Sequence, residues 1–152
     1  MTLEQQLQLI IDDAPKHGVS PIVVELAIAP VIEAYAQRLK QLEYYVLQNL
    51  EGDWVLTTIN NPQLQQSKQV IYAFVSVSDA AAFGGTNPNL MATPISIVQL
   101  LFRLSSLQMV DSIVFLEDSL NLNRGVEIER EQLFQQIKRQ IQHMPKIPPN
   151  LA

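Results

Sequence analysis

The chain has 152 residues, of which 47 % are hydrophobic, so it is the size of one domain and can bury a core of its own. Its formal net charge of −5 argues against a nucleic-acid or anionic-membrane partner, because both need clustered lysine and arginine. The absence of cysteine excludes disulfides, thiolate nucleophiles and zinc–thiolate sites. We find no signal peptide and no apolar run near the roughly 20 residues that cross a bilayer, and therefore expect a cytoplasmic protein.

Two helices are predicted at the start of the chain. Thr2 and Gln5 have the spacing of a capping box, and an apolar stripe at helical spacing continues to about Ala14. Ser20-Pro21 has the form of a second helix start, with Ser as the cap and Pro at the first helical position. Pro30 lies inside this second helix and predicts a kink or a break, because proline removes a backbone hydrogen bond and crowds the preceding turn.

Three strands are predicted next. Residues 43–50 and 54–59 are rich in β-branched and aromatic side chains, and the Glu-Gly-Asp between them predicts a tight hairpin. A polar loop leads to residues 69–77, a long and mostly apolar strand, and residues 78–83 predict one short helical turn. Because short loops join the three strands, we expect them to be antiparallel.

The second half of the chain alternates helices and strands. Thr93-Pro94 predicts the start of a helix to about Leu107, which is apolar except for a narrow stripe of Gln99, Arg103 and Ser106. Residues 112–117 form a continuous apolar run typical of a central strand. A short strand at residues 126–128 and a last helix beginning at Glu129 complete the pattern.

The predicted order of elements is α-α-β-β-β-α-β-(β)-α. This order indicates an α+β fold with a single, mostly antiparallel sheet of four to five strands and helices packed on it. We expect residues 1–144 to form a single domain. Residues 145–152 are rich in proline and are expected to be a flexible tail.

The sequence contains no recognisable catalytic constellation. His17 and His143 lie far apart, and the chain has neither a G-x-S-x-G elbow nor a phosphate-binding loop. We therefore expect no catalytic residue, no metal site, no cofactor and no enzymatic activity. Were the chain an enzyme, Asp79, Glu117 and Asp118 would be the carboxylates to test.

The segment 81–94, AAFGGTNPNLMATP, is either a connector or a ligand site. Its glycines offer flexible backbone amides that could bind an anion, whereas Asn-Pro-Asn is a sequence that fixes turns. A ligand pocket would lie between this segment and the turn at residues 117–124, which follows the predicted central strand. The candidate binding residues are Phe83, Gly84, Gly85, Thr86, Asn87, Glu117 and Asp118.

From the strand at residues 69–77 onward, the chain carries a series of residue types at Phe74, Asp79, Phe83, Leu100, Leu101, Asp111, Asn121, Gly125 and Glu129. In this series the second half of the chain resembles the N-terminal domain of the SseB-like family, the enhanced-serine-sensitivity proteins. The first forty residues are more similar to the opening of type III secretion chaperone-like proteins. Both resemblances imply an α+β domain that binds another protein, often as a homodimer, and neither implies a catalytic residue. They favour a structural crossover for segment 81–94 first and the rim of a binding surface second.

These observations favour a non-catalytic protein-binding module, chaperone- or adaptor-like, that acts as a homodimer. Tyr44, Tyr45 and Trp54 are expected to be exposed aromatics on the surface that meets the partner protein. The alternative is a regulatory domain that senses a small ligand near segment 81–94.

Overall fold

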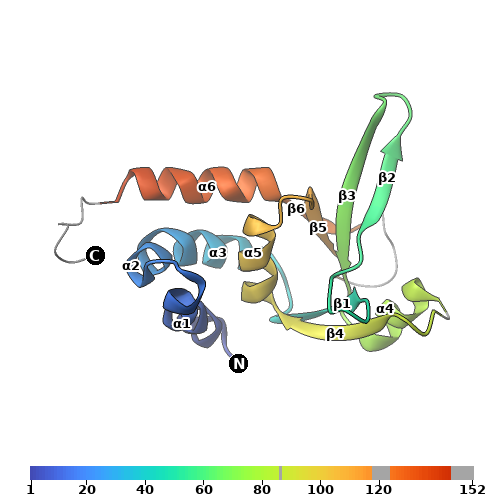
Figure 1. The fold of residues 1–152 in the computed structure, drawn as a ribbon, viewed down its shortest axis with the longest axis horizontal. Coiled ribbons are helices and arrows are strands. Elements are labelled where there is room, and N and C mark those ends of the chain that lie inside the picture. The colour runs from blue at the N-terminus through green and yellow to red at the C-terminus, as the bar shows by residue number, and fades with distance from the viewer. Residues whose placement is uncertain (86, 118–123, 145–152) are drawn as a thin grey trace.

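The computed structural model describes residues 1–85, 87–117 and 124–144, and the predicted tail at residues 145–152 lies outside them. Most of the helices gather at one end of the molecule, and a long hairpin stands away from the other end (Figure 1). The helical segments are α1 (Leu3–Asp13), the 3₁₀ turn η1 (Ala14–His17), α2 (Pro21–Val23), the π-helical turn η2 (Val24–Ile28), α3 (Ala29–Ala36), α4 (Val77–Gly84), α5 (Ile97–Ser106) and α6 (Arg130–Gln142). The strands are β1 (Glu43–Gln48), β2 (Thr57–Asn61), β3 (Gln66–Ala73), β4 (Met91–Ser96), β5 (Ser112–Phe115) and β6 (Val126–Glu129).

The two N-terminal helix starts lie where the sequence predicts them. Thr2 and Gln5 form the capping box. The Gln5 N–H donates to the Thr2 hydroxyl at 3.1 Å, and the Thr2 N–H donates to the Gln5 side-chain oxygen at 2.9 Å. The predicted disturbance at Pro30 takes the form of the π-helical turn η2, which ends two residues earlier. Because Pro30 has no N–H and its ring crowds the preceding carbonyls, a wider turn before it relieves the conflict.

The structure confirms an α+β fold, but the expectation of a single sheet is wrong. β1 and β4 form an antiparallel two-stranded sheet, and the other strands form a four-stranded sheet in the order β2-β3-β5-β6. Within the larger sheet β3 and β5 are parallel, whereas β2–β3 and β5–β6 are antiparallel. The predicted hairpin between residues 43–50 and 54–59 is reduced to one bridge between Gln48 and Trp54.

The second sheet exists because residues 91–96 form a strand, and the helix predicted to start at Thr93-Pro94 begins later. Ser96 caps α5 by accepting a hydrogen bond from the N–H of Gln99 at 3.3 Å. A Thr-Pro pair also suits a strand at a sheet edge, where proline's missing donor costs no ladder bond. Pro94 lies opposite Tyr45 in the antiparallel pair of strands β4 and β1. The local signal was therefore ambiguous between the two structures.

The four-stranded sheet is covered on both faces near its centre. One face packs on the main core, which α1, α3, α5 and α6 complete; its sheet residues are Ile71, Ala73, Ile113, Phe115 and Ile128. The opposite face packs on a smaller cluster formed with α4 and β1; its sheet residues are Val70, Tyr72 and Val114. All four residues of β5 are buried, which confirms the predicted central strand. Among the described helices, none is long and apolar enough to cross a membrane.

Candidate functional site

Segment 81–94 is used largely for packing and turns. Phe83 is half-buried and lies 5.2 Å from Tyr72 and 5.3 Å from Phe74, between ring centroids. A Cβ atom at Gly84 would lie 3.2 Å from a methyl group of Leu47, so a larger residue there would crowd the packing of α4 on β1. Gly85 ends α4 with a positive φ of 68°, which glycine adopts without strain.

Of the four other residues predicted to line the ligand pocket, the structure describes Asn87 and Glu117. Asn87 makes a turn, because its side chain accepts the N–H of Asn89 at 2.9 Å. Thr86 and Asp118 lie outside the described residues. Glu117 accepts a hydrogen bond from the Tyr44 hydroxyl at 2.6 Å and another from the backbone N–H of Lys40 at 3.3 Å. The described contacts of Glu117 therefore join it to β1 and the segment before it.

Two of the three predicted partner-surface aromatics are buried, so the expectation of exposure is wrong for them. Tyr44 is fully buried in the main core, and its ring packs against the edge of Phe115 with centroids 4.9 Å apart. Burial raises the pKa of Tyr44, and the hydrogen bond to Glu117 raises it further. Trp54 is 8 % exposed. Tyr45 is half-buried against the smaller cluster, because strand alternation turns it away from the face of Tyr44.

The most exposed regular structure is the hairpin of β2 and the first part of β3, residues 57–68, which we call the arm. Every residue from 58 to 67 is exposed, and Figure 1 shows the arm standing clear of the body. Ile59 lies in the middle of β2 and Leu64 in the turn, and both keep a large part of their apolar surface in solvent. The arm therefore presents a long surface that the described residues do not cover.

The outer edge of β2 pairs with no other described strand. Its five residues, Thr-Thr-Ile-Asn-Asn, carry no charge and no proline. The opposite edge of the sheet is β6, which carries Glu127 and Glu129, and β4 of the smaller sheet carries Pro94. Charges and proline are the usual protection of sheet edges against pairing with another chain. Of the edges formed by β2, β4 and β6, only that of β2 has neither a charge nor a proline.

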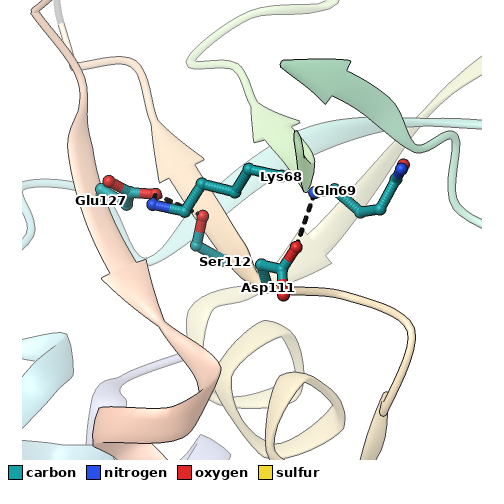
Figure 2. A network of polar contacts seen from close by, with 5 residues as sticks. All are labelled: Lys68, Gln69, Asp111, Ser112 and Glu127. Atoms are coloured by element: carbon teal, nitrogen blue, oxygen red, sulfur yellow. Dashed lines mark hydrogen bonds and ion pairs between the residues drawn. The ribbon is translucent and has the colours of Figure 1, made fainter. Parts of the chain in front are cut away.

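A polar network holds the base of the arm on the body. It consists of Lys68, Gln69, Asp111, Ser112 and Glu127, which we call the base network, and Figure 2 shows their contacts. Lys68 on β3 forms an ion pair with Glu127 on β6, with Nζ 2.6 Å from Oε2. Ser112 on the intervening β5 donates to the same carboxylate oxygen at 2.6 Å. The ion pair therefore spans β5, and one carboxylate joins three strands.

Asp111 makes the second half of the base network. Its side chain accepts the N–H of Gln69 at 2.7 Å, and its own N–H donates to the Gln69 carbonyl at 2.8 Å. Its carbonyl accepts the N–H of Arg130, the first residue of α6, at 2.9 Å. The Gln69 side chain accepts a bond from the Thr58 hydroxyl at 3.0 Å, so the connection reaches β2. The base network thus links both strands of the arm to α6.

Opposing effects set the charge state of the base network. Burial raises the pKa of Glu127, but the hydrogen bonds from Lys68 and Ser112 outweigh it, so the net pKa lies below the usual range. The hydrogen bond to Glu127 raises the pKa of Lys68, although burial works against it. Both groups are therefore charged at neutral pH.

The sequence prediction did not identify the base network. A signal was present, because Ser112 is a polar residue at the start of an apolar run, and a buried hydroxyl needs a partner. The partner could not be found without the sheet order, which brings Glu127 beside residues far away in the sequence. Asp79, the third carboxylate proposed for an enzyme, lies at the start of α4, where its N–H is capped by Ser76.

No group of three or more histidine, aspartate or glutamate side chains able to hold a metal ion occurs within the part of the chain that the structure describes. No model of a known protein family matches the chain, and a search of curated proteins found no match either.

Proposed function

We propose that this chain is a protein-binding module of adaptor or chaperone type that acts as a homodimer, and that two copies join through the outer edge of β2. The observation that carries the proposal is the exposed, uncharged and unprotected edge of β2 on an arm that stands away from the body. Such an edge offers a row of backbone donors and acceptors to a second strand.

The sequence of β2 suits pairing with itself. In an antiparallel pair centred on Ile59, the two Ile59 side chains lie opposite one another, and each Thr57 lies opposite an Asn61 of the other copy. In this pair the apolar residues of the two copies face each other and the polar residues face each other, and no like charges meet. This self-complementarity favours a second copy over a partner strand of different sequence.

The base network supports the proposal by fixing the direction of the arm. An arm free to swing would lose conformational entropy on pairing, which weakens association. The contacts of Lys68 with Glu127 and of Gln69 with Asp111 hold β3 to the sheet before any partner arrives, and the hydrogen bond from Thr58 to Gln69 connects β2. Because a pair of five-residue strands buries less than the roughly 1,600 Å² of a standard interface, we expect a dimer that dissociates on dilution.

Charge placed at the centre of β2 tests the proposal. The variants Ile59→Lys and Ile59→Glu put like charges face to face across the two-fold axis, so each alone should be monomeric. An equimolar mixture should associate again, because opposite charges then meet. Leu64→Lys is the matched control, since it adds the same charge to an exposed apolar residue of the arm outside β2.

Light scattering after size exclusion reports the mass. The wild-type chain and Leu64→Lys should approach twice 17.1 kDa as concentration rises, and the single Ile59 variants should stay near 17.1 kDa. Wild-type protein that remains monomeric up to roughly 1 mM, the weak limit of specific association, would refute the dimer. A dimer that survives Ile59→Lys unchanged would place the interface elsewhere.

A small-ligand role at segment 81–94 stays the alternative hypothesis. Phe83 and Gly84 are committed to packing there, so an occupant would have to use the backbone of Gly85 and Asn87. A larger ligand would have to move Phe83 away from Tyr72 to make room for itself.

A further inference from the structure

A cavity of about 440 Å³ lies between the loop that carries Trp54 and the C-terminal end of α5, away from segment 81–94. Sites for small molecules commonly have volumes of about 300–1,000 Å³. The wall is largely apolar, and Asp53 and Arg103 are its charged members. Leu56 and Met109 are exposed residues of the same wall.

A tight turn places Trp54 at this cavity. The Asn49 side chain accepts the N–H groups of Glu51 and Asp53 at 3.0 and 2.9 Å, and Gly52 adopts a φ of 84° that favours glycine. The turn returns the chain beside β1, where Trp54 pairs with Gln48. Arg103, on the polar stripe of α5, then lies with its guanidinium 4.1 Å from the centre of the Trp54 ring.

An exposed cation and a buried N–H group lie side by side at this place. Trp54 Nε1 is buried and donates to nothing that the structure describes. Arg103 is an exposed residue, so its guanidinium can serve an acceptor that enters the cavity. Burial lowers the pKa of Arg103, and the nearby Asp53 carboxylate offsets part of that effect, but arginine keeps its charge at neutral pH. A charged donor in the wall of a largely apolar cavity would stabilise an anionic acceptor bound there.

We propose that this cavity binds a small organic monocarboxylate, whose oxygens accept from Arg103 beside the Trp54 ring and whose apolar chain lies against Leu56 and Met109. A carboxylate is the acceptor that matches a guanidinium fork. Asp53 in the same wall repels a second negative charge, so a monoanion fits better than a dianion. Neither Arg103 nor Trp54 belongs to β2 or the base network, so this site stands apart from the proposed dimer.

Trp54 is the one tryptophan of the chain, so its fluorescence reports on the cavity directly. The probe is hexanoate, compared with hexanamide, which has the same chain without the charge, and with adipate, which has a second carboxylate. We expect saturable binding of hexanoate and at least about tenfold weaker binding of hexanamide, the loss that a missing charged hydrogen bond produces. Adipate should also bind more weakly than hexanoate, because Asp53 repels its second carboxylate. Isothermal titration with the same compounds detects binding that leaves the fluorescence unchanged.

Arg103→Gln should abolish the preference for hexanoate over hexanamide. Arg38→Gln is the matched control, because Arg38 also stacks on an aromatic ring, that of Tyr35 at 4.5 Å, outside this cavity. The control should keep the wild-type preference. Equal affinity of the wild-type chain for acid and amide, the absence of saturable binding in both assays, or an Arg103→Gln variant that keeps the preference would each overturn the proposal.

Discussion

Replacing Ser112 by alanine tests the base network with the least disturbance. Ser112 is 0 % exposed, and its hydroxyl donates to the Glu127 carboxylate at 2.6 Å. A hydrogen bond to a charged group contributes about 1.5–3 kcal/mol when neither partner finds a replacement. The Glu127 side chain is 36 % exposed, so water and Lys68 can serve it in the variant. We therefore expect a loss below that range, about 1 kcal/mol in the free energy of unfolding.

Urea denaturation followed by circular dichroism measures this loss, with an unchanged slope if only stability is affected. Ser106→Ala is the matched control, because its hydroxyl bonds within its own helix, to the Arg103 carbonyl, and is exposed. A double-mutant cycle with Glu127→Gln should give a coupling free energy of similar size. A Ser112→Ala variant as stable as wild type, or a control that loses as much, would refute this account of the network.

Three further outcomes are expected. The stability that Glu127 contributes through its lowered pKa is present above its ordinary value of 4.5 and should disappear as the pH falls through the lowered pKa, so urea denaturation curves of Glu127→Gln and wild type should converge in acid. Gly125→Ala should lower stability by about 1–3 kcal/mol in thermal unfolding, because the new Cβ would lie 2.3 Å from a methyl group of the buried Val114. Tyr44→Phe should cost about 1 kcal/mol by the same measurement, through loss of its hydrogen bond to Glu117.

Local signals in the sequence predict local structure well in this chain. The capping box at Thr2, the proline at position 30 and the apolar run at residues 112–117 each correspond to the expected structural feature. All three depend on interactions within a few residues of one another, or on burial of a whole segment. They therefore need no knowledge of the sheet order.

Pairing partners were harder to predict, for a physical reason. Residues 43–50 and 54–59 are adjacent in sequence and were expected to pair with each other. Instead each segment pairs with a different strand, β1 with β4 and β2 with β3. That competition depends on residues 91–96, whose Thr-Pro pair suits either a helix start or an edge strand. The error at one dipeptide therefore changed the expected number of sheets.

For the candidate sites, too, features that depend on distant segments were harder to predict than local ones. Aromatic residues in a strand can face either way, so the sequence alone did not show that Tyr44 faces the core while its neighbour Tyr45 lies on the other side. The proposed dimer edge, the base network and the Trp54–Arg103 cavity all depend on contacts between distant segments. A single sequence carries little information on such contacts.

Amide hydrogen exchange of β2 at several protein concentrations tests the central claim most directly. If two copies join through this edge, the amides of residues 57–61 that point away from β3 should become more protected as concentration rises, while those of β6 stay unchanged. Exchange in β2 that is independent of concentration, in a sample whose mass doubles, would contradict the account.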